Sequence, residues 1–164
     1  MTSKLFAAAA LAVSIAAPAA AAPGAPGHSH DSYSVGEPGN PKKPARLVEV
    51  SMKEVDGRML FEPNRIEVRQ GERIRFKLVN AGALDHEFML GTADENKKHA
   101  ALMQKFPEME HDDPNGKSLK SSEKGELVWM FSKLGTFEFA CLRPGHYEAG
   151  MLGTVVVHPA KSKN

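Results

Sequence analysis

The segment from residue 135 to residue 158 constrains the fold of this chain more than any other part of the sequence. It reads GTFEFACLRPGHYEAGMLGTVVVH and contains Cys141, the single cysteine of the chain. Apolar and polar residues alternate before the cysteine, so Phe137, Phe139 and Cys141 share one face of a predicted strand. The apolar run GTVVV predicts a second strand that leads back into the sheet. The pattern therefore predicts two core strands joined by a loop that begins with a buried thiol.

The same alternation recurs along most of the chain after Arg46. Apolar residues with charged residues between them predict half-buried strands. The strongest segments cover residues 47–52, 66–68, 74–78, 86–90 and 127–131. Many short strands separated by turn residues predict an all-β fold in which two sheets pack face to face as a sandwich.

One segment departs from the strand pattern. The sequence ADENKKHAALMQKF, within an insertion at residues 91–125, predicts a helix of about three turns. We expect Asp94 to cap this helix, Pro107 to end it, and Ala100, Met103 and Phe106 to lie near one face. The rest of the insertion, EMEHDDPNGKSLKSSEKG, predicts an acidic loop that ends in turns.

The start of the chain has the pattern of a secretory signal peptide. Lys4 supplies a positive charge, the stretch from Leu5 to Ala17 is apolar, and an alanine run follows. We expect residues 1–21 to be removed and the mature protein to be exported to the periplasm. Residues 22–45 are rich in Pro, Gly, Ser and His and predict a flexible leader, followed by one folded domain at residues 46–160.

The composition excludes several classes of partner. The formal net charge is +1, which argues against binding to nucleic acid or to an anionic membrane. No run after the signal reaches the roughly 18 apolar residues that cross a bilayer. A single cysteine cannot form an internal disulfide, and a lone thiol in an oxidising compartment is open to oxidation. Metal ligation is one way to protect it.

The loop that begins with Cys141 carries three residues that suit a metal. His146 and Met151 follow the cysteine at equal spacing, in the pattern C-x4-H-x4-M. An extended chain would separate Cys141 from His146 by roughly 17 Å, but the Pro-Gly and Ala-Gly pairs in the loop permit the necessary reversals. A thiolate, two imidazoles and a thioether together suit copper, so a second histidine is needed. We predict that it is His86, which opens a strand after the turn-rich sequence NAGALD.

Each of these residues also has a simpler interpretation. Cys141 could be a buried structural thiol, or could pair with His146 as a nucleophile and base. Met151 could be a core residue, and His86 could be a strand-end histidine with a hydrogen-bonded ring. Their joint occurrence around one turn-rich loop favours a metal site.

The chain resembles the cupredoxins, the blue-copper family, over residues 46–158. The resemblance lies in C-x4-H-x4-M, in N-x5-H, and in the segment FEPNRIEVRQGERIRFKLVN. The motif DHEFML and the insertion bearing Met and His are similar to bacterial periplasmic copper-resistance cupredoxins of the CopI kind. The resemblance implies a Greek-key sandwich with one type 1 copper, and a role in copper tolerance through electron transfer or cuprous-ion oxidation. One departure is Glu87, where many members have Asn. The resemblance therefore does not establish that the usual hydrogen bond near the thiolate is present.

A second, weaker copper site is an alternative, because thioethers and imidazoles suit Cu(I). Its candidate residues are Met89, Met103, Met109, His111, His28 and His30. Such a site would favour a Cu(I) chaperone or sink. However, strand parity points Met89 away from His86, Met103 fits the apolar face of the helix, and the leader histidines can be solvated.

The resemblance favours a binding and redox protein over an enzyme. Multicopper oxidases and copper nitrite reductases have histidines beside the type 1 cysteine, whereas Ala140 and Leu142 are the neighbours here. A cuprous oxidase remains an alternative. The expected partners are copper and a periplasmic redox or copper-handling protein that the sequence does not identify.

Overall fold

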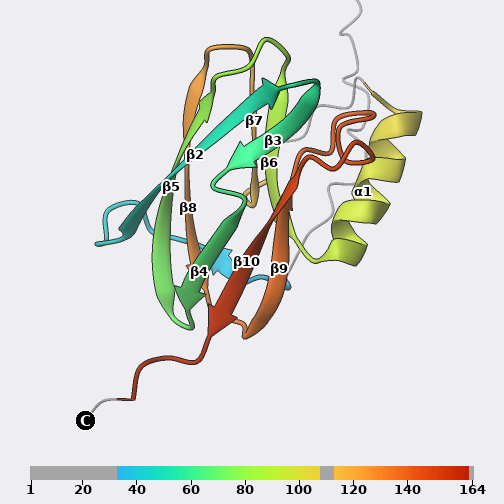
Figure 1. The fold of residues 1–164 in the computed structure, drawn as a ribbon. Coiled ribbons are helices and arrows are strands. Elements are labelled where there is room, and N and C mark those ends of the chain that lie inside the picture. The colour runs from blue at the N-terminus through green and yellow to red at the C-terminus, as the bar shows by residue number, and fades with distance from the viewer. Residues whose placement is uncertain (1–32, 108–112, 163–164) are drawn as a thin grey trace, which may run out of the picture.

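The computed structural model describes residues 33–107 and 113–162, which form two five-stranded sheets packed face to face (Figure 1). The first sheet has the order β1(Glu37–Pro38), β8(Lys124–Phe131), β5(Glu72–Asn80), β2(Arg46–Val55), β3(Arg58–Glu62). The second has the order β4(Arg65–Arg69), β10(Leu152–His158), β9(Gly135–Ala140), β6(His86–Gly91), β7(Gly116–Leu119). The predicted two-sheet sandwich with one short helix is confirmed.

Both sheets are mixed. β2 runs parallel to β5 and β10 runs parallel to β4, while the other neighbouring strands are antiparallel. Parallel neighbours cannot be joined by a tight hairpin, and in each of these pairs the chain passes through the other sheet before it returns. As a result, β6 and β9, which lie far apart in the sequence, become neighbours in the second sheet.

The core is built from the inward faces of both sheets and is rich in phenylalanine. Phe88 of β6 stacks on Phe139 of β9 with 5.1 Å between ring centroids, and Phe61 meets Phe139 edge to face at 5.1 Å. Such pairs each contribute about 0.5–1.5 kcal/mol beyond their burial. Phe139 is two residues before Cys141, and both side chains are fully buried, so the thiol lies on a densely packed aromatic core.

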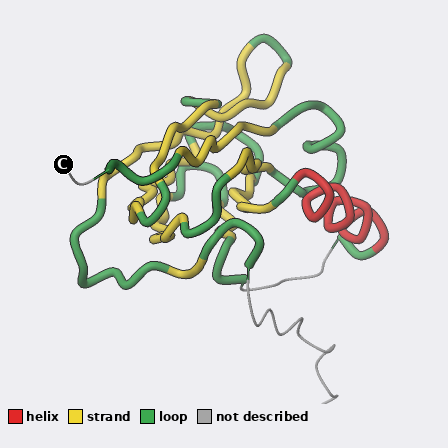
Figure 2. The backbone as a smooth tube through the Cα atoms, turned by 90° about the horizontal axis from the view of Figure 1, so that it is seen from below, coloured by secondary structure: helices red, strands yellow, loops and turns green. Residues whose placement is uncertain are grey.

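The helix α1(Ala93–Lys105) lies outside the strands at the periphery of the sandwich (Figure 2). Its cap is Thr92 and not Asp94. The Thr92 side chain accepts a hydrogen bond from the Glu95 N–H, and the Glu95 side chain accepts one from the Thr92 N–H. This capping box was visible in the sequence as T-x-x-E, and it explains why Asp94 is not needed as the cap.

The apolar face of α1 is shorter than predicted. Ala100 and Met103 are buried, but Phe106 is 56% exposed. Phe106 is the C-cap, and its backbone is no longer helical (φ −133°, ψ 68°), so its side chain does not continue the apolar face of the helix. Across residues 33–107 and 113–162, no helix is both long and apolar enough to span a bilayer.

Within the predicted domain at residues 46–160, two strands were not predicted. β3 follows a tight turn in which Asp56 and Gly57 both have positive φ, the conformation of a two-residue hairpin turn, so the dipeptide was a usable signal. β7 lies in the stretch that was predicted as an acidic loop ending in turns. It pairs with β6 through backbone hydrogen bonds although its sequence, GKSL, lacks apolar alternation.

The fold begins before Arg46, the expected start of the domain. Val35 is 2% exposed and belongs to the core, and the Tyr33 ring meets Trp129 edge to face at 5.2 Å. β1 then pairs with the edge of β8. Only two apolar side chains are involved, which is too few to show in the composition of the segment. Residues 1–21 and 22–32 of the predicted signal and leader lie outside the described residues.

We expect Val35→Ala to lower the free energy of unfolding by about 1–3 kcal/mol, because it removes two buried methyl groups. Chemical denaturation of the mature protein measures this change. Leu134→Ala is the control, since Leu134 is 52% exposed and should change stability by less than about 0.5 kcal/mol. Equal stability of the Val35 variant and wild type would show that residues 33–38 do not contribute to the fold.

Candidate metal centre

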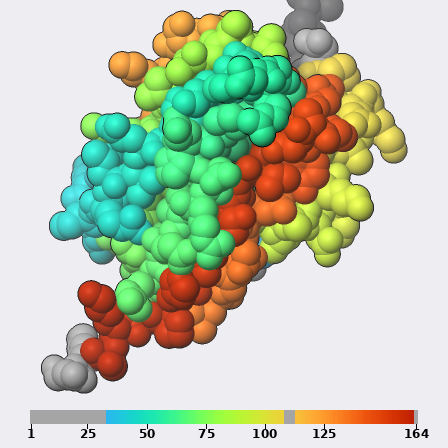
Figure 3. Space-filling model, viewed as in Figure 1, coloured from blue at the N-terminus to red at the C-terminus, as the bar shows by residue number. Residues whose placement is uncertain are grey.

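The predicted ligands lie at one end of the sandwich, where β6, β9 and β10 meet the loop between β9 and β10. His86 is the first residue of β6, Cys141 directly follows β9, and Met151 directly precedes β10. The space-filling view shows the segment after Cys141 lying between β3 and α1 (Figure 3). His86, Cys141 and Met151 are therefore held at or beside strand ends, and His146 lies within the loop.

Hydrogen bonds fold the loop onto itself. The Cys141 N–H donates to the Met151 carbonyl at 3.1 Å, and the Met151 N–H donates to the His146 carbonyl at 3.0 Å. Gly145 and Gly150 have φ of 85° and 87°, a region that glycine adopts without strain. The reversals expected from the Pro-Gly and Ala-Gly pairs are therefore present, and they bring the three loop residues to one place.

Three donor atoms converge at this end of the fold. Cys141 Sγ lies 3.3 Å from His146 Nδ1 and 4.0 Å from His86 Nδ1, and the two Nδ1 atoms are 3.3 Å apart. Trigonal bonds of ~2.0 Å to nitrogen and ~2.3 Å to sulfur would separate such donors by ~3.5–3.7 Å. The three atoms thus fit a single metal ion, and they form a compact His–Cys–His group.

Met151 is fully buried and belongs to the same core cluster as Cys141. Its backbone is tied to the loop on both sides, through its N–H to His146 and through its carbonyl to Cys141. Its thioether as the fourth, axial donor stays a prediction. The burial and the ties are consistent with that role, because neither end of Met151 is free to move away.

Burial raises the pKa of the Cys141 thiol to about 12. The shift follows from loss of hydration, since the side chain is fully buried on the aromatic core. Backbone hydrogen bonds from Glu87 and Arg143 oppose the shift by favouring the thiolate. At neutral pH the thiol is protonated, and a metal that binds the sulfur must displace this proton.

The sequence did not show whether Cys141 receives a hydrogen bond at this position, and in the structure the donor is the Glu87 backbone. The Glu87 N–H donates to Cys141 Sγ at 3.3 Å, a contact that does not depend on the identity of the side chain. The Glu87 carboxylate is buried, and it accepts a hydrogen bond from the Ser118 hydroxyl of β7 at 3.4 Å. Cys141 Sγ therefore still accepts a hydrogen bond from residue 87, although this residue is Glu instead of Asn.

The His146 imidazole is only partly buried, unlike the fully buried His86. Burial lowers the pKa of His146, and the nearby His86 and Arg143 lower it further. A lowered pKa keeps the ring neutral at neutral pH, with a lone pair available for a metal. His146 is thus the predicted ligand that lies nearest to solvent.

One residue of the centre was not predicted. Glu54, near the end of β2, accepts a hydrogen bond from His86 Nε2 at 2.6 Å. Burial raises the pKa of Glu54, but hydrogen bonds from the Ala83 N–H, the His86 ring and the Leu84 N–H outweigh it, and the net pKa is lowered. Glu54 continues the inward alternation of Val50 and Met52, so strand parity places it on the inward face but does not identify His86 as its partner.

The residues of the alternative copper site are not brought to this centre. Met89 points to the other side of β6, as parity predicts, and packs in a separate cluster with Ala100, Ala140 and Leu142. Met103 is buried within α1. The other candidates, Met109, His111, His28 and His30, lie outside the described residues.

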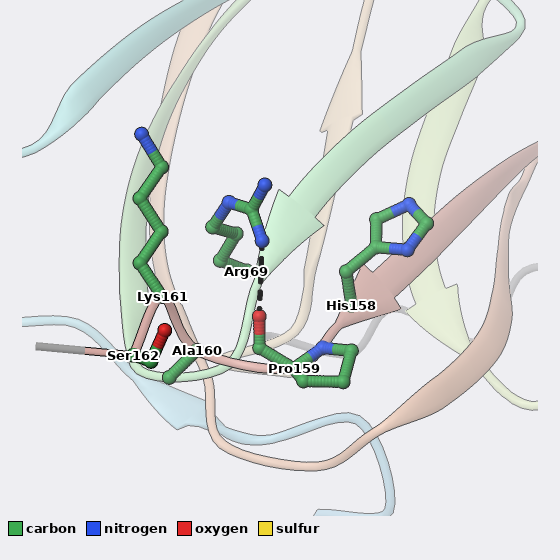
Figure 4. Close-up of a pocket in the computed structure, with 6 residues that line it drawn as sticks. All are labelled: Arg69, His158, Pro159, Ala160, Lys161 and Ser162. Carbon is green, nitrogen blue, oxygen red and sulfur yellow. Dashed lines mark hydrogen bonds between the residues drawn. The ribbon is translucent and has the colours of Figure 1, made fainter. Parts of the chain in front are cut away.

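A hollow at the far end of β10 is separate from the candidate centre. It is lined by Arg69, His158, Pro159, Ala160, Lys161 and Ser162 (Figure 4). β10 spans seven residues from Leu152 to His158, which places the hollow ~20 Å from the loop. His158 is an exposed histidine hydrogen-bonded to Glu67, as expected for a surface residue.

A β-sandwich with two imidazoles and a thiol converging at one end defines the cupredoxin class. Residues 48–158 match the family described as copper binding proteins, plastocyanin/azurin family. This match spans most of the chain, and the chain belongs to that family. The resemblance predicted from the sequence is confirmed.

Within the family, the chain is similar to proteins described as copper-resistant cuproprotein CopI. The protein from Rubrivivax gelatinosus is 48% identical over 122 residues, which cover 74% of this chain and 72% of the relative. The protein from Pseudomonas aeruginosa is 35% identical over 153 residues, covering 76% and 82%. Among solved structures, auracyanin B has a TM-score of 0.61 at 25% identity and covers 76% of this chain and 96% of that chain.

We expect Cys141 of the metal-free protein to resist alkylation, because its thiolate is scarce and its sulfur is buried. At about pH 8 the native protein should react with iodoacetamide at least about 100-fold more slowly than the same protein in denaturant. Mass spectrometry of a time course measures both rates. Equal rates would contradict the burial and the raised pKa of the thiol.

Proposed function

We propose that this chain is a periplasmic type 1 copper protein that binds one copper ion through His86, Cys141, His146 and Met151. The observation that carries the proposal is the convergence of Cys141 Sγ with the Nδ1 atoms of His86 and His146. Family membership supports copper as the metal. A buried thiol with two imidazoles and a neighbouring thioether is the donor set that suits both Cu(I) and Cu(II).

Copper bound at this centre would supply one-electron chemistry. The protein contributes a site whose donors are fixed by three strand ends and by hydrogen bonds within the loop. Such a scaffold limits how far the donors move between oxidation states, which favours rapid electron transfer. The partly buried His146 imidazole offers the route between the centre and a partner at the surface.

We assign the protein to copper tolerance, acting by electron transfer or by oxidation of cuprous ions. The support is its similarity to proteins described as copper-resistant cuproproteins, with the chain covering more than two thirds of their length. The signal-peptide pattern at residues 1–21 supports the periplasm as the location.

The burial of Met89 and Met103 favours this single-centre function over a Cu(I) sink. Both side chains are at most 5% exposed, so neither offers a thioether to an incoming ion without local opening. Ala140 and Leu142 beside the cysteine are fully buried apolar residues, and they provide no donors for further coppers of an enzyme.

The proposal is tested by adding Cu(II) to the purified mature protein and measuring bound copper and the visible spectrum. We expect about one copper per chain and a strong thiolate-to-copper absorption band that disappears in Cys141→Ser. His158→Gln is the matched control, because His158 lies at the far end of β10, and it should keep both stoichiometry and band. A Cys141→Ser protein that retains the band would refute the assignment.

A further inference from the structure

Glu54 is placed against the centre by the alternation of β2. Val50 and Met52 are buried on the inward face of this strand, and Glu54 is the next residue of the same face. β2 belongs to the first sheet and His86 to the second, so the contact between them crosses the sandwich. Beyond the end of the core, the inward position is taken by a carboxylate instead of an apolar side chain.

The Glu54 carboxylate receives hydrogen bonds from the ring of His86 and from the loop that precedes it. Its Oε1 atom lies 2.6 Å from His86 Nε2 and 3.3 Å from the Leu84 N–H, and its Oε2 atom lies 2.8 Å from the Ala83 N–H. An ionised carboxylate only accepts hydrogen bonds, so Nε2 of the ring must carry the hydrogen. The Nδ1 lone pair is then directed at the space shared with Cys141 and His146.

The chain leaves room for this carboxylate at Gly82. A Cβ atom at Gly82 would lie 2.5 Å from Glu54 Oε1 and 2.6 Å from Oε2, which is closer than nonbonded atoms can approach. The missing side chain at residue 82 therefore allows the carboxylate to reach His86. The atoms in the way belong to the end of a flexible side chain, so an added methyl group would push the carboxylate aside and leave the backbone in place.

Burial makes the contact strong. The His86 side chain is fully buried and the Glu54 side chain is 27% exposed, so water competes weakly for the hydrogen bond. A hydrogen bond to an ionised acceptor is roughly twice as strong as one between neutral groups. A carboxylate on the far nitrogen of a ligating imidazole also raises the basicity of the nitrogen that binds the metal.

We propose that Glu54 is a positioning residue that holds His86 as the Nε2–H tautomer and strengthens its bond to Cu(II) more than its bond to Cu(I). This inference rests on the proposed function, because it takes His86 as a copper ligand. The greater effect on Cu(II) follows from charge, since a more basic imidazole stabilises the more highly charged ion more. Glu54 would thus lower the reduction potential of the centre.

The test compares Glu54→Gln and Gly82→Ala with Glu49→Gln. The first removes the charge and keeps the shape, while the second keeps the charge and displaces the carboxylate. The control removes the same charge from an exposed position on β2, five residues and ~17 Å away, where solvent and salt screen it. We expect the ratio of Cu(II) to Cu(I) affinity to fall about tenfold in both test variants, a rise in potential of about 59 mV. The double variant should add little more.

A second readout needs no copper. In ¹⁵N spectra of the metal-free wild type, His86 should show a protonated Nε2 and an unprotonated Nδ1. Both test variants should move toward a mixture of tautomers, whereas Glu49→Gln should match the wild type. Wild-type protein that lacks the thiolate-to-copper band would refute the proposed function, and this tautomer measurement would still judge the role of Glu54.

Three results would overturn the inference. If the test variants bind Cu(I) and Cu(II) with equally weakened affinity, the potential stays at the wild-type value and Glu54 only anchors the loop. If their potentials and His86 spectra match those of Glu49→Gln, the carboxylate does not act on the ring. An increased potential in Glu54→Gln but not in Gly82→Ala would also contradict the proposal, because the contact between the carboxylate and His86 would then not set the potential.

Discussion

The antiparallel pairing of β9 with β10 is the constraint on which the candidate centre depends. It sets Ala140 opposite Leu152, and the hydrogen bond from Cys141 to Met151 extends the pairing by one step. The loop between them is therefore closed at its base, and within it Cys141 Sγ and His146 Nδ1 lie 3.3 Å apart. Ordering this loop costs conformational entropy, and the packing of the aromatic core beneath it offsets that cost.

The second histidine is positioned by sheet register. Because Met89 pairs with Ala140, β6 extends past the end of β9 and brings His86 beside the loop. Alternation turns His86 to the same inward face as Phe88 and Leu90, so its ring continues the core. The centre thus uses the ordinary geometry of two neighbouring strands. The first sheet adds Glu54, which holds the far side of the His86 ring.

Much of this arrangement could be predicted from the sequence, and the failures have physical reasons. The period-2 pattern found the main core strands, and the equal spacing after Cys141 identified residues that the structure brings together. β7 was missed because its sequence, GKSL, places only Leu119 in the core and shows no apolar alternation. Val35 was missed because one buried side chain leaves no pattern. Glu54 continued a correctly predicted alternation, but its partner lies on the opposite sheet, and pairing across the sandwich is not visible in local sequence.

The central claim is that the donors are already arranged before metal binds. Crystal structures of the metal-free and copper-loaded protein test this claim most directly. We predict that Cys141 Sγ and the Nδ1 atoms of His86 and His146 differ by no more than about 0.5 Å between the two states, as expected for a site held by rigid strands. Copper bound elsewhere, or a loop that rearranges around Cys141 to bind it, would contradict the account.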